Sequence, residues 1–444
     1  MDSFGFRDGQ LYVEDVPVSL IAERFGTPTY IYSAATLRDH AGKMKEAFAE
    51  LKPRLCFAAK CCSNVAVLRT LVQSGCGMDV VSGGELYRAL LAGCKPEDIV
   101  YAGVGKTAAE IRFALGQRDG VEPAHGSVRL PEGPIGCFNI ESEQELAAIA
   151  SEARAMGVRA VAAVRVNPGV KAGGHEYITT AHEESKFGLP IDLAEAMIKR
   201  FAGDKHVKLS GLHMHIGSSI TDPQLYVTAV ERMIAMIDRL AVAGVKIESL
   251  DLGGGFAADY QTGDAPAPRE FAKRIVPLLA DRVRGGLRIV LEPGRMIAAN
   301  AGILLTRVLY TKQTGARKFL ICDAGMHTLI RPSLYDAFHF IWPVSVSPQH
   351  EPLRRSEALE LPGLEACDVV GPVCESGDFL AKQRMLPPVT PGELLSVFAA
   401  GAYGMSMASR YNSHPMPAEV LVSGDGVQLV RRRETLADLV AHER

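Results

Sequence analysis

Lys60 is the side chain of this 444-residue sequence with the clearest chemical use. It follows the apolar run Leu55-Cys56-Phe57-Ala58-Ala59, which predicts a buried strand that points one amine into a cavity. Apolar surroundings disfavour the ammonium form of a lysine, and the neutral amine forms a Schiff base with an aldehyde. On its own the pattern also fits a solvated lysine at the rim of a strand.

Asp79 ends the next apolar segment and is expected to lie close to Lys60. Its carboxylate would stabilise a protonated nitrogen at Lys60; the alternative is a salt bridge that only ties two strands together. A second feature is the glycine triplet Gly253-Gly254-Gly255, which follows Leu250-Asp251-Leu252. Glycines let successive backbone N–H groups converge on an anion, which suits a phosphate.

Glu292 ends a further apolar segment, where a buried carboxylate without a partner costs several kcal/mol. Its partner is either Arg295, three residues on, or the protonated ring nitrogen of a cofactor. In the second case the guanidinium of Arg295 is available for a substrate carboxylate. With Lys60 and the glycine triplet, this pattern indicates a pyridoxal phosphate site.

His213 and His215 alternate along the predicted strand Leu209 to Ser218, so both side chains should share its inner face. Such a pair also occurs at metal centres, but no clear further ligand set completes a shell, and we predict no metal. His215, which Gly217-Ser218 follows, is the candidate for a ring stacked on the cofactor. His213 fits a core histidine equally well.

These side chains need a scaffold that brings the carboxyl ends of many strands together. Eight short apolar segments alternate with helical patterns: Leu55 to Lys60, Met78 to Ser82, Ile99 to Gly103, Cys137 to Glu141, Ala160 to Asn167, Leu209 to Ser218, Ser249 to Gly255 and Arg288 to Glu292. The alternation predicts an α/β fold with a parallel (β/α)8 barrel, for which an open doubly wound sheet is the alternative. Reactive side chains at the strand ends favour the barrel.

Beyond residue 303 strand-like runs separated by turns predict an all-β C-terminal domain. The expected organisation is an N-terminal segment 1–31 that packs with the β domain, the barrel 32–303 and the β domain 304–444. Tyr30-Ile31-Tyr32 is interpreted as a crossing linker. Gly120 to Gly136, rich in Gly and Pro, predicts a surface excursion.

Composition limits the classes of partner. The hydrophobic content of 47% suits a soluble enzyme, and the formal charge of −3 comes from interspersed residues without a basic stripe for nucleic acid. The first residues lack the order of a signal peptide, and no apolar run is long enough to span a bilayer. The nine cysteines are scattered. We therefore expect a cytoplasmic protein with small-molecule partners.

The chain resembles the pyridoxal phosphate enzymes of the alanine racemase barrel fold, and within their group IV decarboxylases the diaminopimelate decarboxylases. Beyond the glycine triplet and the Glu292 loop, further motifs carry the resemblance: Phe57-Ala58-Ala59-Lys60, Asp79-Val80-Val81-Ser82-Gly83-Gly84-Glu85-Leu86, Val104-Gly105-Lys106-Thr107, Ser185-Lys186-Phe187-Gly188, His215-Ile216-Gly217-Ser218, Cys374-Glu375-Ser376-Gly377-Asp378 and Gly401-Ala402-Tyr403. They span nearly the whole chain.

The resemblance implies a role for each matching position. The residues implied to bind the cofactor are Lys60, Asp79, His215, Ser218, Gly254, Gly255, Glu292, Gly294, Arg295 and Tyr403. Those implied to hold the substrate are Arg295, Arg331, Tyr335, Glu375 and Tyr403. Lys60, His215 and Cys374 are implied to be catalytic, with Cys374 returning a proton after carbon dioxide leaves. Because the Cys374 loop of the family reaches the other subunit's site, a homodimer is implied.

Two arginines near one amino acid predict a substrate that keeps a carboxylate at its distal end, and Glu375 could accept a distal ammonium. This pattern matches meso-2,6-diaminopimelate, with L-lysine and carbon dioxide as products. His327, where the family commonly has Asn, leaves room for another substrate: ornithine, arginine, carboxynorspermidine or an amino acid tethered to a carrier protein. A racemase and a non-catalytic carrier of pyridoxal phosphate are competing hypotheses.

Overall fold

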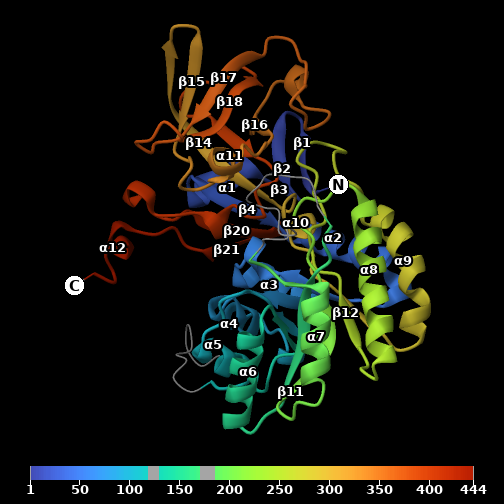
Figure 1. Ribbon diagram of the computed structural model, residues 1–444. Helices are drawn as coiled ribbons and strands as arrows, with labels where there is room; N and C mark the ends of the chain where they lie inside the picture. Colours follow the sequence, from blue (N-terminus) through green and yellow to red (C-terminus); the bar gives the residue numbers. More distant parts are fainter. Residues whose placement is uncertain (1, 119–129, 171–185, 444) are drawn as a thin grey trace. The chain divides into compact units, whose positions relative to one another are not determined.

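The computed structural model describes residues 2–118, 130–170 and 186–443 (Figure 1), so most of the predicted Gly120 to Gly136 excursion and Ser185 lie outside the described residues. Contacts divide the chain into two compact units. The barrel unit comprises Ala41–Ala257 and Pro266–Gly294, and the β unit comprises Met1–His40, Ala258–Ala265 and Arg295–Arg444. The boundaries predicted after residues 31 and 303 stay a prediction.

The barrel unit confirms the predicted fold class. Eight of its parallel strands within the described residues pair in chain order, and the circle closes because Leu291 on the last strand pairs with Leu55 on the first. A two-residue strand, β10 (Leu189–Pro190), adds to β9 outside this circle. The strands are β5 (Arg54–Ala58), β6 (Gly77–Val80), β7 (Ile99–Tyr101), β8 (Cys137–Ile140), β9 (Ala160–Asn167), β11 (Val207–His213), β12 (Ser249–Asp251) and β13 (Arg288–Leu291). A closed ring excludes the open doubly wound alternative.

Amphipathic helices connect the strands and lie around them (Figure 1): α3 (Val65–Gln73), α4 (Gly83–Leu91), α5 (Ala108–Ala114), α6 (Glu143–Ala155), α7 (Ile191–Phe201), α8 (Pro223–Val242) and α9 (Pro268–Arg284). Many begin at a residue whose side chain accepts a hydrogen bond from the first turn, such as Asn64, Ser82 and Ser142. These capping hydrogen bonds define where α3, α4 and α6 start after β5, β6 and β8.

Most barrel strands end one or two residues before the predicted end, and β11 and β12 end furthest from it. β11 stops at His213 and β12 at Asp251, whereas the sequence pattern continued to Ser218 and Gly255. Glycines with positive φ angles turn the chain after each strand: Gly217 at +146° after β11, and Gly253 and Gly255 at +68° and +108° after β12. His215 therefore lies beyond the strand, and the argument that placed both histidines on one strand face is wrong.

The β unit contains a mixed sheet with the order β18-β17-β15-β14-β4-β20-β21. In addition, β19 pairs with β14, and β16 pairs with β19. Its strands are β4 (Thr29–Ser33), β14 (Gly302–Thr314), β15 (Arg317–Cys322), β16 (Ile341–Pro343), β17 (Glu365–Val370), β18 (Phe379–Leu386), β19 (Leu394–Val397), β20 (Ala418–Ser423) and β21 (Gly426–Arg431). A small antiparallel sheet of β1 (Phe4–Arg7), β2 (Gln10–Val13) and β3 (Val16–Pro17) precedes it. The predicted all-β character is confirmed.

Tyr30-Ile31-Tyr32 is not a linker. These residues lie in β4, which pairs antiparallel with β14 and parallel with β20, and every residue of β4 is buried. Its sequence, Thr-Tyr-Ile-Tyr-Ser, contains a single aliphatic residue and lacks the continuous apolar run that marked the barrel strands, which is why it did not predict a strand. Short helices complete the unit: α1 (Val18–Phe25), α10 (Arg295–Ala298), α11 (Arg331–Tyr335) and α12 (Leu436–Leu439). The boundary between the two units at His40 and Ala41 falls within helix α2 (Ala34–Ala47).

The described helices include none that combines the length and the apolar character needed to cross a membrane.

Candidate active site

Lys60 and Asp79 form an ion pair at the carboxyl ends of adjacent barrel strands. The Lys60 Nζ lies 3.0 Å from the Asp79 Oδ2; the Lys60 side chain is 34% exposed and that of Asp79 is fully buried. Burial and the charge of Glu292 raise the pKa of Asp79 to about 7, although the charge of Lys60 opposes this shift. The predicted proximity is correct, and the salt bridge considered as the alternative is present. An amine held there by a carboxylate remains partly open for covalent chemistry.

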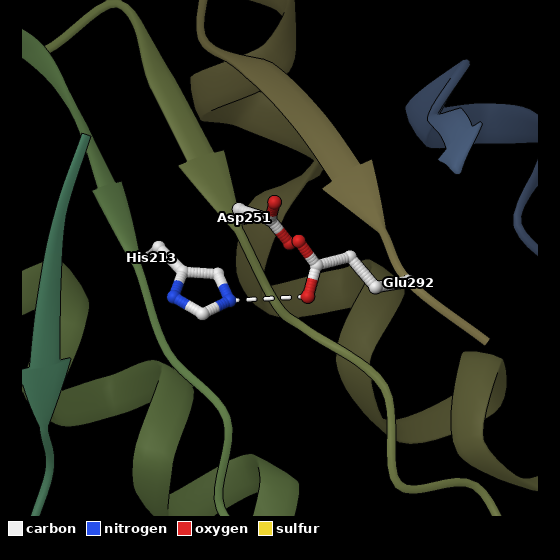
Figure 2. A group of neighbouring side chains, drawn as sticks. All are labelled: His213, Asp251 and Glu292. Carbon is white, nitrogen blue, oxygen red and sulfur yellow. Dashed lines mark hydrogen bonds and ion pairs between the residues drawn. The ribbon is translucent and has the colours of Figure 1, made fainter. Parts of the chain in front are cut away.

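Glu292 lies fully buried next to the barrel strands with hydrogen bonds at both oxygens. Its Oε2 lies 3.1 Å from the Nε2 of His213 (Figure 2). Its Oε1 accepts a hydrogen bond of 3.1 Å from the Nδ2 of Asn139. Burial alone would raise the pKa of Glu292, but His213 and Lys60 lower it below its usual value. The charges of His213 and Lys60 thus keep Glu292 an anion, and Arg295, the alternative partner considered from the sequence, is not among the groups that lower its pKa.

Asp251 completes a group with His213 and Glu292 that the sequence did not predict. Figure 2 shows its carboxyl group close to that of Glu292, and its buried Oδ2 has no hydrogen-bond partner among the residues described. Burial and the charge of Glu292 raise the pKa of Asp251 well above its usual value. Two carboxyl groups that face each other without a donor between them require one shared proton, so Asp251 is the acid of the pair.

The ligand atoms of His213, Asp251 and Glu292 lie within 4.8 Å of one another. Asp251 on β12 and Glu292 after β13 thus supply, beside His213, the further ligand atoms that the sequence did not reveal. The prediction that the site uses no metal stays a prediction, because these side chains have the donor atoms that an ion needs.

His215 is partly buried and neutral. Burial and the charge of Lys60 lower the pKa of His215 well below its usual value, and its Nδ1 accepts a hydrogen bond of 3.3 Å from the backbone N–H of Gly254. This bond leaves the proton on Nε2. The histidine is thus tied to the glycine triplet, and its stacking on a cofactor stays a prediction.

The glycine triplet has no room for side chains. A Cβ at Gly253, Gly254 or Gly255 would lie 2.1 to 2.3 Å from a backbone oxygen of a neighbouring segment. Gly294 is also enclosed, because a Cβ there would meet Ala58 and Cys61 at 3.0 to 3.1 Å. Glycine is therefore required at these positions for close packing of the backbone, which is the arrangement expected for a phosphate-binding loop.

In the β unit two arginines stack on tyrosine rings. The guanidinium of Arg295 lies 4.6 Å from the ring centre of Tyr403, and its Nη1 donates a 2.7 Å hydrogen bond to the hydroxyl of Tyr260. The guanidinium of Arg331 lies 4.7 Å from the ring centre of Tyr260. Both arginines are buried, and no carboxylate of the described residues forms an ion pair with Arg331. A buried cation without a counter-ion favours binding of an anion.

The Cys374 loop connects β17 and β18 and is anchored at several points. The buried carboxyl group of Asp378 accepts hydrogen bonds of 2.6 Å from the backbone N–H groups of Met326 and Val373. At the tip, Cys374 is exposed, and Glu375 accepts a 2.7 Å hydrogen bond from Tyr411. The two predicted residues of this loop are thus held in a defined, exposed position.

Comparisons with known proteins identify the family of the chain. The family model described as "Pyridoxal-dependent decarboxylase, pyridoxal binding domain" matches residues 34–299. The diaminopimelate decarboxylase of Pseudomonas aeruginosa is 43% identical over 443 residues, which cover 100% of this chain and 99% of that protein. The enzyme of the same name from Haemophilus influenzae is 41% identical over 443 residues, with coverage of 100% and 99%.

The chain belongs to the diaminopimelate decarboxylase family of pyridoxal-dependent decarboxylases. Solved structures of that family are similar throughout. The Helicobacter pylori diaminopimelate decarboxylase, complexed with L-lysine, has a TM-score of 0.85 and 35% identity and covers 96% of this chain and 99% of its own. The M. jannaschii diaminopimelate decarboxylase has a TM-score of 0.88 and 33% identity, with coverage of 100% and 98%.

Membership in the diaminopimelate decarboxylase family makes the chain a carboxy-lyase that uses pyridoxal 5′-phosphate. The residues present fit this cofactor: Lys60 supplies a partly open amine, the enclosed glycine triplet suits a phosphate, and Glu292 is an anion able to accept from a ring nitrogen. The roles of the individual residues, including Ser218 and Tyr335, stay predictions.

Besides Asp251, three residues of the site were missed in the sequence. Asn139 lies in β8, where a polar side chain in the apolar run Cys137–Ile140 was an available signal. Tyr260 lies in an irregular segment without a motif, and His339 follows α11 in a short stretch that carries no motif either. For these two residues only the fold reveals the contact with the arginines.

Proposed function

We propose that this protein decarboxylates meso-2,6-diaminopimelate to L-lysine and carbon dioxide, the last step of lysine biosynthesis. The observation that supports this substrate is the pair of buried, tyrosine-stacked arginines, because decarboxylation of a simple diamine precursor requires no second carboxylate site. The full-length relatives carry the name diaminopimelate decarboxylase, and the Helicobacter pylori structure is complexed with L-lysine.

The barrel residues would hold and tune the cofactor. Lys60 would bind it covalently through Nζ, and the backbone N–H groups near Gly254 and Gly255, with Ser218, would bind its phosphate. When bound, the cofactor ring withdraws electrons from the bond that breaks. Glu292, the anion that His213 and Asn139 stabilise, would accept a hydrogen bond from the ring nitrogen and so keep that nitrogen protonated.

The residues of the β unit would select the substrate and finish the reaction. Arg295 and Arg331 would bind the carboxylate that survives, with Tyr335 and Tyr403 beside them, and Glu375 would accept the distal ammonium. The Cys374 thiol would return a proton to the carbon that has lost its carboxylate.

A product assay tests this function. The purified protein with pyridoxal phosphate is incubated separately with meso-diaminopimelate, ornithine, arginine and carboxynorspermidine, and products and carbon dioxide are measured. Lysine from diaminopimelate alone supports the proposal. Turnover of another substrate without lysine formation contradicts it, interconversion of alanine enantiomers without gas indicates a racemase, and no release of gas from any substrate indicates a carrier.

We also propose a homodimer in which the Cys374 loop of one subunit serves the site of the other, as the exposed tip of this loop suggests. Lys60→Ala and Cys374→Ala subunits, each of very low activity, are mixed and re-associated. With shared sites, half of the dimers are mixed and each has one intact site, so about a quarter of the wild-type activity returns. No recovery, although mass spectrometry shows mixed dimers, contradicts the shared site.

Finally, we propose a cytoplasmic location. Most of the nine cysteines are buried, where they act as small apolar side chains, which suits a reducing compartment. Cell fractionation with antibodies against the protein tests this location, and recovery outside the cytoplasmic fraction contradicts it.

A further inference from the structure

His339 is a buried histidine that contacts the substrate-binding arginines but has no role in the proposed reaction. It lies after α11, is fully buried, and packs edge-on against Tyr260 with ring centres 5.4 Å apart. Its Nε2 lies 2.8 Å from Nη1 of Arg331, and its Nδ1 lies 2.9 Å from the backbone oxygen of Phe398.

These two contacts fix the tautomer of the ring. A guanidinium only donates hydrogen bonds, so the Nε2 of His339 must be the acceptor. A carbonyl oxygen only accepts, so the proton must be on Nδ1 and is donated to Phe398. Burial, followed by the charge of Arg331, lowers the pKa of His339 to about 3. The imidazole is therefore a neutral acceptor over the working pH range.

A neutral acceptor has a consequence that a carboxylate would not have. An aspartate or glutamate at position 339 would orient Arg331 equally well, but it would also cancel its charge. His339 orients the guanidinium and leaves the charge available. Tyr260 acts in the same way, because its ring faces Arg331 and its hydroxyl accepts from Arg295 without adding a negative charge.

We propose that His339 is a positioning residue that determines specificity: it holds Arg331, stacked on Tyr260, as an oriented and uncompensated cation for the substrate carboxylate that is not lost. The inference rests on the proposed function, since it assigns that carboxylate to these arginines. The role of His339 explains why the site binds a compound that keeps a carboxylate, such as L-lysine, in preference to 1,5-diaminopentane, which has none.

The test compares two ligands that differ only in this carboxylate. L-Lysine retains it and 1,5-diaminopentane lacks it, and both are titrated into the holoenzyme of wild type and variants. His339→Leu, which removes the acceptor, is expected to weaken lysine binding and raise KM for diaminopimelate about tenfold. Binding of 1,5-diaminopentane and uptake of pyridoxal phosphate by the apoprotein are expected to change less than about twofold.

Two further variants separate orientation from charge. His339→Gln places an amide oxygen near the position of Nε2 and is expected to restore lysine binding to within about threefold of wild type. His339→Glu keeps an acceptor but neutralises Arg331, and it is expected to weaken lysine binding more than His339→Leu does. If His339 had only a structural role, the lysine affinities of the variants would instead follow their thermal stabilities.

The proposal is overturned if His339→Leu leaves lysine binding unchanged or weakens both ligands equally. If His339→Leu does not fold, the comparison of His339→Gln with His339→Asn decides, because the shorter Asn does not reach Arg331; equal affinities for lysine overturn the proposal. Failure of the proposed function would be distinct, because wild type would then yield no lysine in the product assay, whereas the two-ligand comparison would still report on carboxylate binding.

Discussion

At the scale of single residues, the chemistry of this site depends on which groups carry protons. Asp79, Asp251 and Glu292 are three buried carboxyl groups, and their pKa values move in different directions because their partners differ: burial dominates for Asp79 and Asp251, whereas His213 and Lys60 outweigh burial for Glu292. One anion at Glu292 is therefore compatible with the low dielectric of the interior.

Lys60→Ala is expected to abolish the visible absorption band of the bound cofactor and to lower kcat by roughly 10³-fold or more, because no amine remains to bind the aldehyde. Lys60→Arg is the matched control: it retains the charge opposite Asp79 but cannot form the covalent bond. Absorption spectra and carbon dioxide release measure both variants. Retention of band and turnover in Lys60→Ala would show that another lysine is the anchor.

Asp251→Asn is expected to change kcat by less than about threefold, because an amide also donates to Glu292 while its oxygen still accepts from the N–H of Gly253. Glu292→Gln removes the anion and is expected to lower kcat by about 10²-fold or more. Steady-state kinetics and the spectrum of the bound cofactor compare the two. An equal loss in both variants would mean that Asp251 is ionised.

At the scale of elements, the sequence predicted where strands begin better than where they end. Every barrel strand lies within or next to its predicted segment because apolar runs mark strands buried on both faces. The ends of β11 and β12 were missed because the apolar alternation continues into loops in which glycines with positive φ turn the chain.

Contacts between distant elements could not be predicted in this way. Asn139 and Glu292 are 153 positions apart and meet only because β8 and β13 lie in one closed ring. Lys60 and Asp79 were predicted together because they end consecutive strands, for which the register is nearly determined. Tyr260 contacts the arginines from an irregular segment whose place in the β unit no sequence pattern indicates.

Gly254→Ala tests the loop that β12 leads into. A Cβ would lie 2.1 Å from the backbone oxygen of Glu292, so the loop or the residue after β13 must move. We expect about tenfold weaker cofactor binding and a thermal midpoint lower by several degrees. Gly203→Ala is the control, because nothing lies within 4 Å of its Cβ position. Equal cofactor affinities of the two variants would refute the role of the loop.

At the scale of the whole molecule, buried histidines make stability depend on pH. Burial and the charge of Arg331 lower the pKa of His339 to about 3, and burial and His414 lower the pKa of His327 to about 4, from ordinary values near 6.5. The unfolded chain binds protons at these histidines below pH 6.5 and the folded chain does not. Stability is therefore present above pH 6.5 and is lost as the pH falls towards 4.

The lowered pKa of His339 alone is expected to reduce the free energy of unfolding by about 2 kcal/mol at pH 5 relative to neutral pH. His339→Gln should therefore show a smaller fall in thermal midpoint between pH 7 and pH 5 than wild type, measured by circular dichroism. His442→Gln, at an exposed position near the C-terminus, serves as the control and should follow wild type. Parallel curves for His339→Gln and wild type would contradict this assignment.

The place of β4 also constrains how the chain is made. Thr29–Ser33 leaves the ribosome early, yet its neighbour β14 begins at Gly302 and its other neighbour β20 at Ala418. At the usual rates of translation the first of these neighbours is synthesised roughly 15 to 55 s later. During that interval an apolar strand has no pairing partner, so the nascent polypeptide should depend on chaperones more at its N-terminus than within the barrel.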